Sequence, residues 1–207
     1  MKPLIRTPKP ARGFSLIELL LVLAVIAILL GLLFPAFAGA RQSARQVACL
    51  ANLRTFGQAF HAYLGDSRGL IPWAVDYADV RVDDLAPFDV LAKHLDAPLP
   101  RYDRGVVTAQ PYTCPADRSH GPTTGFSYLY FPHWLMQLAT DPPARAQRAY
   151  SILYDRSPFA VILIDPAVLH PPRAPTPSVT DNRGRNMLLY EGSARACDQQ
   201  LPPLLFR

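Results

Sequence analysis

The chemically most unusual residue of this chain is an acid at the start of a long apolar segment. Glu18 is followed by Leu19 to Ala40, a run of about 22 residues without a charged side chain. A carboxylate beside hydrocarbon costs several kcal/mol unless it meets a cation or hydrogen-bond donors. The chemistry that this position favours is therefore ion pairing inside an apolar environment.

The apolar run is long enough to cross a membrane. At about 1.5 Å per residue it would form a helix of roughly 30 Å, the thickness of a bilayer core. The preceding residues 1–13 carry four basic side chains and no acid: Lys2, Arg6, Lys9 and Arg12. Because basic flanks stay on the cytoplasmic side, we expect the N-terminus in the cytoplasm and the rest of the chain outside.

Three kinds of N-terminal segment are compared for this pattern. A secretory signal peptide has a shorter apolar core and a small-x-small cleavage site, for which residues 36–38 and 38–40 qualify. An uncleaved membrane anchor explains the length of the apolar run and its basic flank, but it assigns no role to Glu18. The third is a prepilin, because Gly13-Phe14-Ser15-Leu16-Ile17-Glu18 resembles the G-F-[ST]-L-[IVL]-E signal of type IV pilins and type II secretion pseudopilins.

The resemblance implies a route of maturation and assembly. In that family a prepilin peptidase cuts before the apolar run, here between Gly13 and Phe14, and the new amine of Phe14 is N-methylated. Glu18 would then pair with the Phe14 amine of a neighbouring pilin-like subunit, added at an inner-membrane assembly platform. Gly31 and Pro35 both weaken a helix, and they would allow it to bend as it leaves the lipid. The alternative is that they only produce a kink that a membrane helix tolerates.

Later motifs are similar to those of a pseudopilin-like group common in planctomycete and verrucomicrobial bacteria. Residues Cys49 to Arg54 match its C-x-x-N-L-R element, and Cys114 to Asp117 match its C-P-x-D element. Many members end in His, nine residues, then Asp-Gly. In this chain the corresponding positions are Asp181 and, after nine residues, Glu191-Gly192, so the spacing is kept while the His and the Asp are replaced. This difference puts any shared role of that His in doubt.

The three cysteines lie beyond the apolar run, in an oxidising compartment for the expected orientation. A Cys49–Cys114 disulfide is preferred because it would join the following domain to the helix. A Cys114–Cys197 disulfide and free thiols remain alternatives, since the sequence alone does not fix the connectivity.

Metal and enzyme chemistry have little support. Asp181, Glu191 and Asp198 could supply oxygen ligands for calcium, as some secretion pseudopilins do near the C-terminus, or could be solvated turn acids. No other cofactor is expected. The chain contains no H-E-x-x-H, G-x-S-x-G, Walker A or G-x-G-x-x-G motif, so we expect a protein that is not an enzyme.

The elements that would position these residues follow from periodicity. Apolar residues recur every three or four positions from Ala44 to Leu64, which predicts one helix of roughly 50 residues together with the apolar run. Strands are predicted over 126–131, 160–164 and 186–190, and a short helix over 84–95. The 22 prolines, Pro142-Pro143 among them, mark loops. Three or four antiparallel strands against the helix give an α+β fold.

The chain thus divides into four segments: a cleaved leader (1–13), a transmembrane and assembly helix (14–40), its amphipathic continuation (41–65) and a periplasmic head (66–207). Loss of the leader lowers the net charge from +5 to about +1, so nucleic-acid binding is not expected. The favoured function is a structural subunit of a type II secretion pseudopilus. Alternatives are a type IV pilus subunit for adhesion, motility or DNA uptake, a tethered periplasmic binding module that does not polymerise, and a secreted hydrolase.

Overall fold

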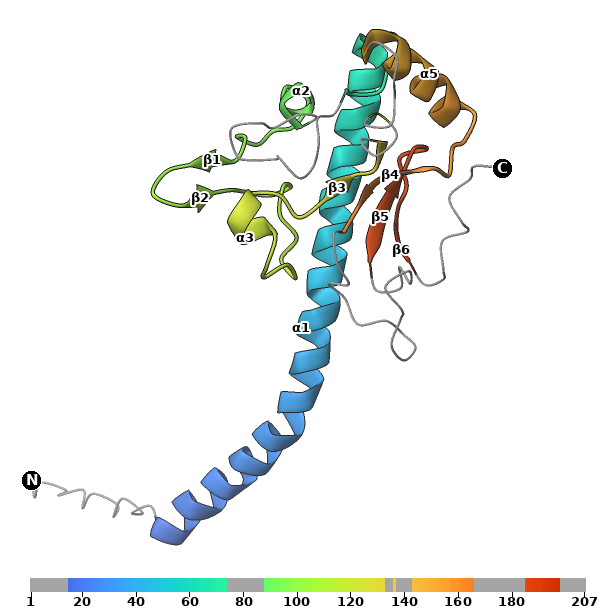
Figure 1. Cartoon of the computed structure of the whole chain (residues 1–207). Helices are drawn as coiled ribbons and strands as arrows, with labels where there is room; N and C mark the ends of the chain where they lie inside the picture. The colour runs from blue at the N-terminus through green and yellow to red at the C-terminus, as the bar shows by residue number, and fades with distance from the viewer. Residues whose placement is uncertain (1–14, 74–87, 133–135, 137–142, 166–184, 198–207) are drawn as a thin grey trace, which may run out of the picture. The chain divides into compact units, whose positions relative to one another are not determined.

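A single helix, α1 (Leu16–Asp66), runs through the N-terminal third of the chain (Figure 1). The computed structural model describes residues 15–73, 88–132, 136, 143–165 and 185–197. By its internal contacts the chain forms two units, Met1–Arg41 and Gln42–Arg207, and α1 belongs to both. The 51 residues of α1 confirm the prediction of one continuous helix.

The second unit contains a four-stranded antiparallel sheet with the strand order β3-β4-β5-β6, and we call the part of this unit that follows α1 the head. Its strands are β3 (Leu129–Tyr130), β4 (Val161–Ile164), β5 (Asn186–Leu189) and β6 (Ala194–Ala196). In the register of the central strands, Leu163 of β4 lies opposite Tyr130 on one side and Leu188 on the other. The predicted α+β class is therefore confirmed.

Shorter elements complete the head. They are the hairpin β1 (Arg101–Tyr102) and β2 (Val106–Val107), and the helices α2 (Phe88–Ala92), α3 (Gly121–Thr124) and α5 (Pro143–Asp155).

The core of the head forms around one face of the second half of α1. Phe56 is fully buried, and its ring makes edge-to-face contacts with Phe88, Tyr112 and Tyr128 at centroid distances of 5.5–5.8 Å. Leu163 and Leu188 of the sheet belong to the same cluster. Aromatic contacts of this geometry add to the hydrophobic stabilisation that burial itself provides.

The buried face of α1 begins later than the sequence predicted. Ala44 is exposed and the side chain of Val47 is 62% exposed, whereas Cys49, Leu53 and Phe56 are fully buried. The apolar period does continue upstream, but in the described part of the chain Cys49 is the first fully buried residue of α1, and Arg45, Gln46 and Ala48 are only partly covered. Cys49 is bonded to the head through a disulfide, and full burial of the helix face begins at this residue.

Two bonds attach adjacent residues of the head to one face of α1. Cys49 forms a disulfide with Cys114, the pairing that the sequence favoured, with Cα atoms 4.9 Å apart. One turn along the helix, the side-chain amide of Asn52 donates a hydrogen bond to the carbonyl oxygen of Thr113 at 2.9 Å. The C-x-x-N spacing places both side chains on the same face because residues three apart are neighbours on a helix.

Since Cys114 is used in this way, the alternative Cys114–Cys197 bond does not form. Cys197 is buried in a second cluster with Val161, Ile164, Met187 and Leu189.

The C-P-x-D element ends in a buried acid that organises the next turn. Asp117 accepts hydrogen bonds from the backbone N–H groups of Ser119, His120 and Gly121 and from the Ser127 hydroxyl, the last at 2.6 Å. Burial alone would raise the pKa of this carboxyl, but these donors together hold it below its ordinary value.

Several elements depart from the sequence predictions. Pro142-Pro143 was predicted to mark a loop, yet Pro143 is the first residue of α5, a position where the missing N–H costs nothing. Strand β6 was not predicted, because Ala-Arg-Ala lacks the branched or aromatic residues typical of strands. The predicted helix over 84–95 corresponds to α2, which is shorter, and residues 84–87 lie outside the described residues.

The sheet approaches α1 closely at a glycine. A Cβ atom on Gly57 would lie 2.9 Å from Leu188 Cδ1 and 3.1 Å from the carbonyl oxygen of Gly192. Gly192 itself, in the Glu191-Gly192 turn, has a φ of +90°, which favours glycine. The chain therefore needs Gly57 for close packing and Gly192 for its backbone conformation.

We predict that Gly57→Ala destabilises the head by about 1–3 kcal/mol, because the new methyl group overpacks a buried contact. Gly65→Ala is the matched control, since it lies in the same helix with nothing within 4 Å of its Cβ position. At position 65 the gain in helix propensity should stabilise the protein by about 0.5–1 kcal/mol. Urea unfolding of the full chain in detergent, followed by near-ultraviolet circular dichroism, compares the two. Equal effects of both substitutions would contradict the close packing.

A second prediction concerns the disulfide. Its partners are 65 positions apart, so Cys49→Ser should destabilise the head by about 4 kcal/mol through the larger entropy of the unfolded chain. Cys114→Ser should have the same effect, and the double variant should add little, because both changes remove one bond. The same urea titration, with and without a reductant, measures this. Additive losses from the two single variants would show that each thiol stabilises independently.

Candidate processing and assembly segment

The start of α1 is fixed by the acid that the sequence singled out. Ser15 directly precedes the helix, and its backbone N–H donates a hydrogen bond to Glu18 Oε2 at 2.9 Å. The Ser15 carbonyl accepts the first helical hydrogen bond, from the N–H of Leu19. A Glu three residues after an N-terminal Ser that reaches back to its N–H is one half of a capping box. Glu18 therefore caps its own helix.

This role of Glu18 was not predicted from the sequence, although S-x-x-E before an apolar run is a recognisable helix-start pattern. Within the described part of the chain, the second oxygen, Oε1, accepts no hydrogen bond. A carboxylate has room for several donors on its two oxygens. Glu18 is thus able to cap α1 with one oxygen and meet a cation with the other.

The predicted cleavage site, Gly13 and Phe14, lies outside the described residues. The described helix begins at Leu16, two residues after Phe14 in the sequence. Ser15 and Glu18 hold the helix start at that position.

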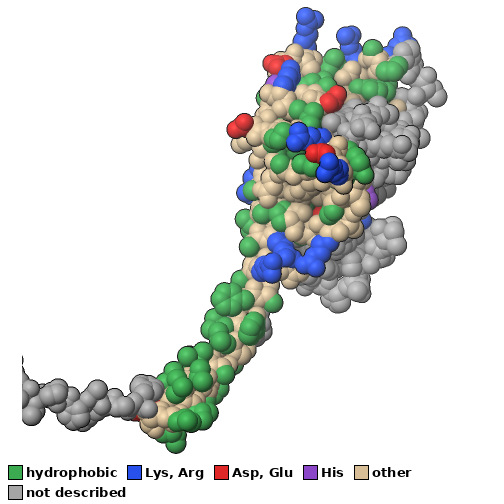
Figure 2. Space-filling model, turned by 90° about the vertical axis from the view of Figure 1, so that its left-hand side faces the viewer, with side chains coloured by type: hydrophobic (Ala, Val, Ile, Leu, Met, Phe, Trp, Pro, Cys, Tyr) green, Lys and Arg blue, Asp and Glu red, His purple; other side chains and the backbone are tan. Residues whose placement is uncertain are grey.

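The apolar side chains of the first half of α1 have almost no cover. Every Leu, Ile, Val and Phe from Leu16 to Phe37 is 44–77% exposed (Figure 2). By length and composition, α1 is the one helix among the described residues that is able to cross a membrane, with a mean hydropathy of 3.1 in its most apolar window. An apolar surface on all sides of a helix requires lipid or other apolar helices around it.

The two residues predicted to allow a bend lie inside this helix. Gly31 and Pro35 both have helical backbone, and a Cβ on Gly31 would have nothing within 4 Å. The bend at these residues stays a prediction.

Of the predicted calcium ligands, the structure describes Glu191. Its Oε1 accepts hydrogen bonds from the Ser193 hydroxyl at 2.6 Å and from Arg195 Nη2 at 2.7 Å. Asp181 and Asp198 lie outside the described residues. Among those residues that the structure describes, no three His, Cys, Asp or Glu side chains come together as a metal site. Glu191 is therefore already paired with a cation, while the calcium proposal as a whole stays untested.

A comparison with known families supports the interpretation of the N-terminal segment. Residues 8–34 match the family model of the prokaryotic N-terminal methylation motif. No curated protein and no solved structure gives a significant match to the chain. The chain thus carries a type IV pilin-like prepilin segment, which implies processing by a prepilin peptidase and assembly with other pilin subunits. The motif and the apolar helix are together consistent with anchoring in the inner membrane.

We predict that Glu18→Ala is processed and inserted but does not enter filaments. The variant leaves the amine of a neighbouring subunit unpaired inside an apolar bundle, which costs roughly 3–5 kcal/mol. Immunoblots of sheared filaments against the membrane fraction measure incorporation, and mass spectrometry of the mature N-terminus measures processing.

Because Glu18 also caps α1, Glu18→Gln is the variant that separates its two roles. Glutamine is accepted at this position of a capping box but carries no charge. If ion pairing is essential, Glu18→Gln fails to assemble as Glu18→Ala does. Normal incorporation of Glu18→Gln would instead assign the requirement to the cap.

Proposed function

We propose that this protein is a non-enzymatic structural subunit of a type II secretion pseudopilus. In this proposal the leader is cut between Gly13 and Phe14, and the amine of Phe14 is methylated. The head lies in the periplasm while α1 anchors the subunit in the inner membrane. Assembly then transfers α1 from lipid into a bundle of equivalent helices.

The observation that carries the proposal is the uncovered apolar half of α1 with a single acid at its start. Lipid alone would cover the apolar side chains, but it offers no partner for the carboxylate of Glu18. A bundle of such helices supplies both an apolar surround and the cationic amine at the start of a neighbouring chain. A pair of opposite charges of that kind fixes register between subunits more than it adds net stability.

The attachment of the head to α1 supports a mechanical role. The disulfide at Cys49 and the hydrogen bond from Asn52 join residues 113–114 to the helix, and the buried face continues to Leu64. In a growing filament, a displacement of α1 would therefore carry the head with it. This arrangement suits a subunit that pushes folded cargo toward an outer-membrane channel.

The test compares the extracellular proteome of a deletion strain with that of its parent. We expect selective loss of secreted enzymes, with accumulation of the same enzymes in the periplasm. Complementation with the natural gene should restore secretion, whereas Glu18→Ala at equal membrane abundance should not. An unchanged secretome would overturn the secretion role, and filaments on the cell surface would then favour a type IV pilus subunit.

A further inference from the structure

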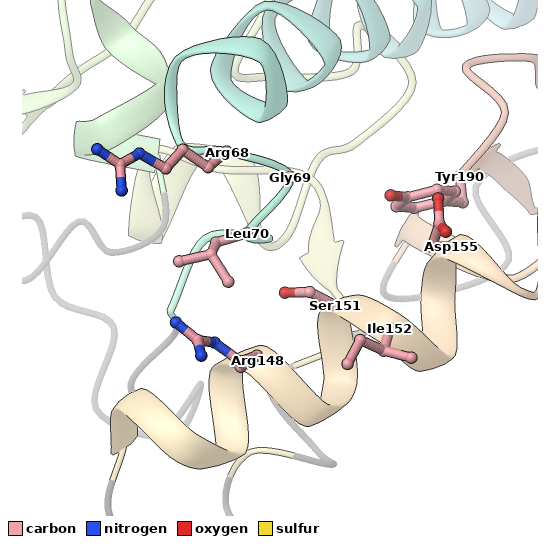
Figure 3. A pocket seen from close by; sticks show the side chains of 8 residues that line it. All are labelled: Arg68, Gly69, Leu70, Arg148, Ser151, Ile152, Asp155 and Tyr190. Carbon is pink, nitrogen blue, oxygen red and sulfur yellow. The ribbon is translucent and has the colours of Figure 1, made fainter.

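A pocket of about 490 Å³ lies in the head between the turn that follows α1 and one face of α5 (Figure 3). Four residues of α5 line it at helical spacing: Arg148, Ser151, Ile152 and Asp155. The opposite wall is formed by residues 68–70 and Tyr190. The volume falls within the range of pockets that hold small ligands or short peptide segments.

The two walls are held together by hydrogen bonds that leave the pocket itself open. The backbone N–H of Ile71 donates to the Ser151 hydroxyl at 2.9 Å, and the side-chain amide of Gln147 donates to the Ile71 carbonyl at 2.7 Å. Ile71 is fully buried. Tyr190 is fixed as well, since its ring packs 5.9 Å from both Phe60 and Tyr154. The pocket is therefore formed before any ligand arrives.

Arg68 occupies a backbone position that favours glycine. The N–H of Gly69 bonds to the Leu64 carbonyl, which closes α1 with the longer bond of a Schellman motif and makes Arg68 its left-handed residue. The φ of Arg68 is +56°, a conformation that costs energy for a side chain with a Cβ. A strained non-glycine residue that lines a pocket points to a function of its side chain.

The charges in the pocket are separated. Figure 3 shows Arg68 and Arg148 at one end and Asp155 with Tyr190 at the other. Within the described part of the chain, none of these three charged groups forms an ion pair. Burial and the charge of Asp155 raise the pKa of Tyr190. Arg148 and Asp155 are seven residues apart on α5, a rise of about 10 Å.

We propose that this pocket binds a segment of another polypeptide in the polyproline II conformation that carries a carboxylate and a cationic side chain three residues apart. Three residues of a polyproline II segment rise about 9 Å and return to the same face, which is close to the backbone rise between Arg148 and Asp155 on α5. The carboxylate pairs with the guanidinium group of Arg148, which suits its planar shape, and the charge of Arg68 adds to the positive potential at that end of the pocket. The cationic group lies at Asp155, and the apolar stem contacts Leu70 and Ile152.

Asp155 favours a peptide over a phosphate-bearing ligand. A phosphate group or a nucleic-acid backbone brings only negative charge, which Asp155 repels. A peptide with charges of both signs satisfies both ends of the pocket. The proposal concerns the head alone and does not depend on filament assembly.

The probe for the test is the tetrapeptide acetyl-Glu-Ala-Ala-Lys-amide, with acetyl-Gln-Ala-Ala-Gln-amide as the neutral control. Saturation-transfer NMR of the full chain in detergent micelles measures binding. We expect transfer to the charged peptide only, with affinity about tenfold weaker in Arg148→Gln. Arg156→Gln is the matched control, because Arg156 is exposed, follows α5 directly and does not line the pocket. Its affinity should equal that of the natural protein.

Arg68→Gly provides an independent check. It relieves the left-handed strain, so the melting temperature should rise by about 2–4 °C while peptide affinity falls. A purely structural role of Arg68 would not couple these two changes in opposite directions. Absence of transfer to either peptide, equal transfer to both, unchanged affinity in Arg148→Gln, or displacement of the peptide by an equal concentration of inorganic phosphate would each overturn the proposal.

Discussion

One continuous helix has to satisfy two environments, and the rest of the structure depends on how it does so. The first half of α1 has apolar side chains on all sides and leaves them exposed. The second half buries one face, from Cys49 to Leu64, against the head. Along the helix this requires a change from hydrophobic residues at every position to hydrophobic residues at every third or fourth position. The head is the protein's own cover for the second half, and lipid or other subunits must cover the first.

The contact between head and helix is built from few but different interactions. A disulfide and an amide hydrogen bond hold two adjacent residues, Cys114 and Thr113, while Phe56 packs against the ring of the neighbouring Tyr112. At Gly57, the lack of a side chain lets the turn at Gly192 approach the helix backbone. Such a contact resists sliding along the helix because covalent, polar and steric restraints act at successive turns of one face.

At the start of α1, the single carboxylate of Glu18 both caps the helix and lies in an apolar segment. Glu18 caps the helix through the Ser15 N–H, and it remains the only acid in a segment that needs an apolar surround. Capping neutralises an unpaired backbone donor without neutralising the charge itself. In the proposed assembly, the remaining charge would make association with a cationic chain end more favourable than continued residence in lipid.

The sequence by itself determined the long helix, its two environments, the prepilin segment and three of the four strands of the sheet, because periodicity and local motifs carry that information. It also favoured the Cys49–Cys114 pairing without excluding the alternatives. The tertiary structure decided where the head begins to cover α1, that Asp165 is buried with its pKa raised to about 7 by burial, and that a pocket forms beside α5. Long-range bonds such as those from Asn52 to Thr113 and from Ile71 to Ser151 join residues 61 and 80 positions apart. No local pattern encodes such pairs, since they form only when the whole head packs.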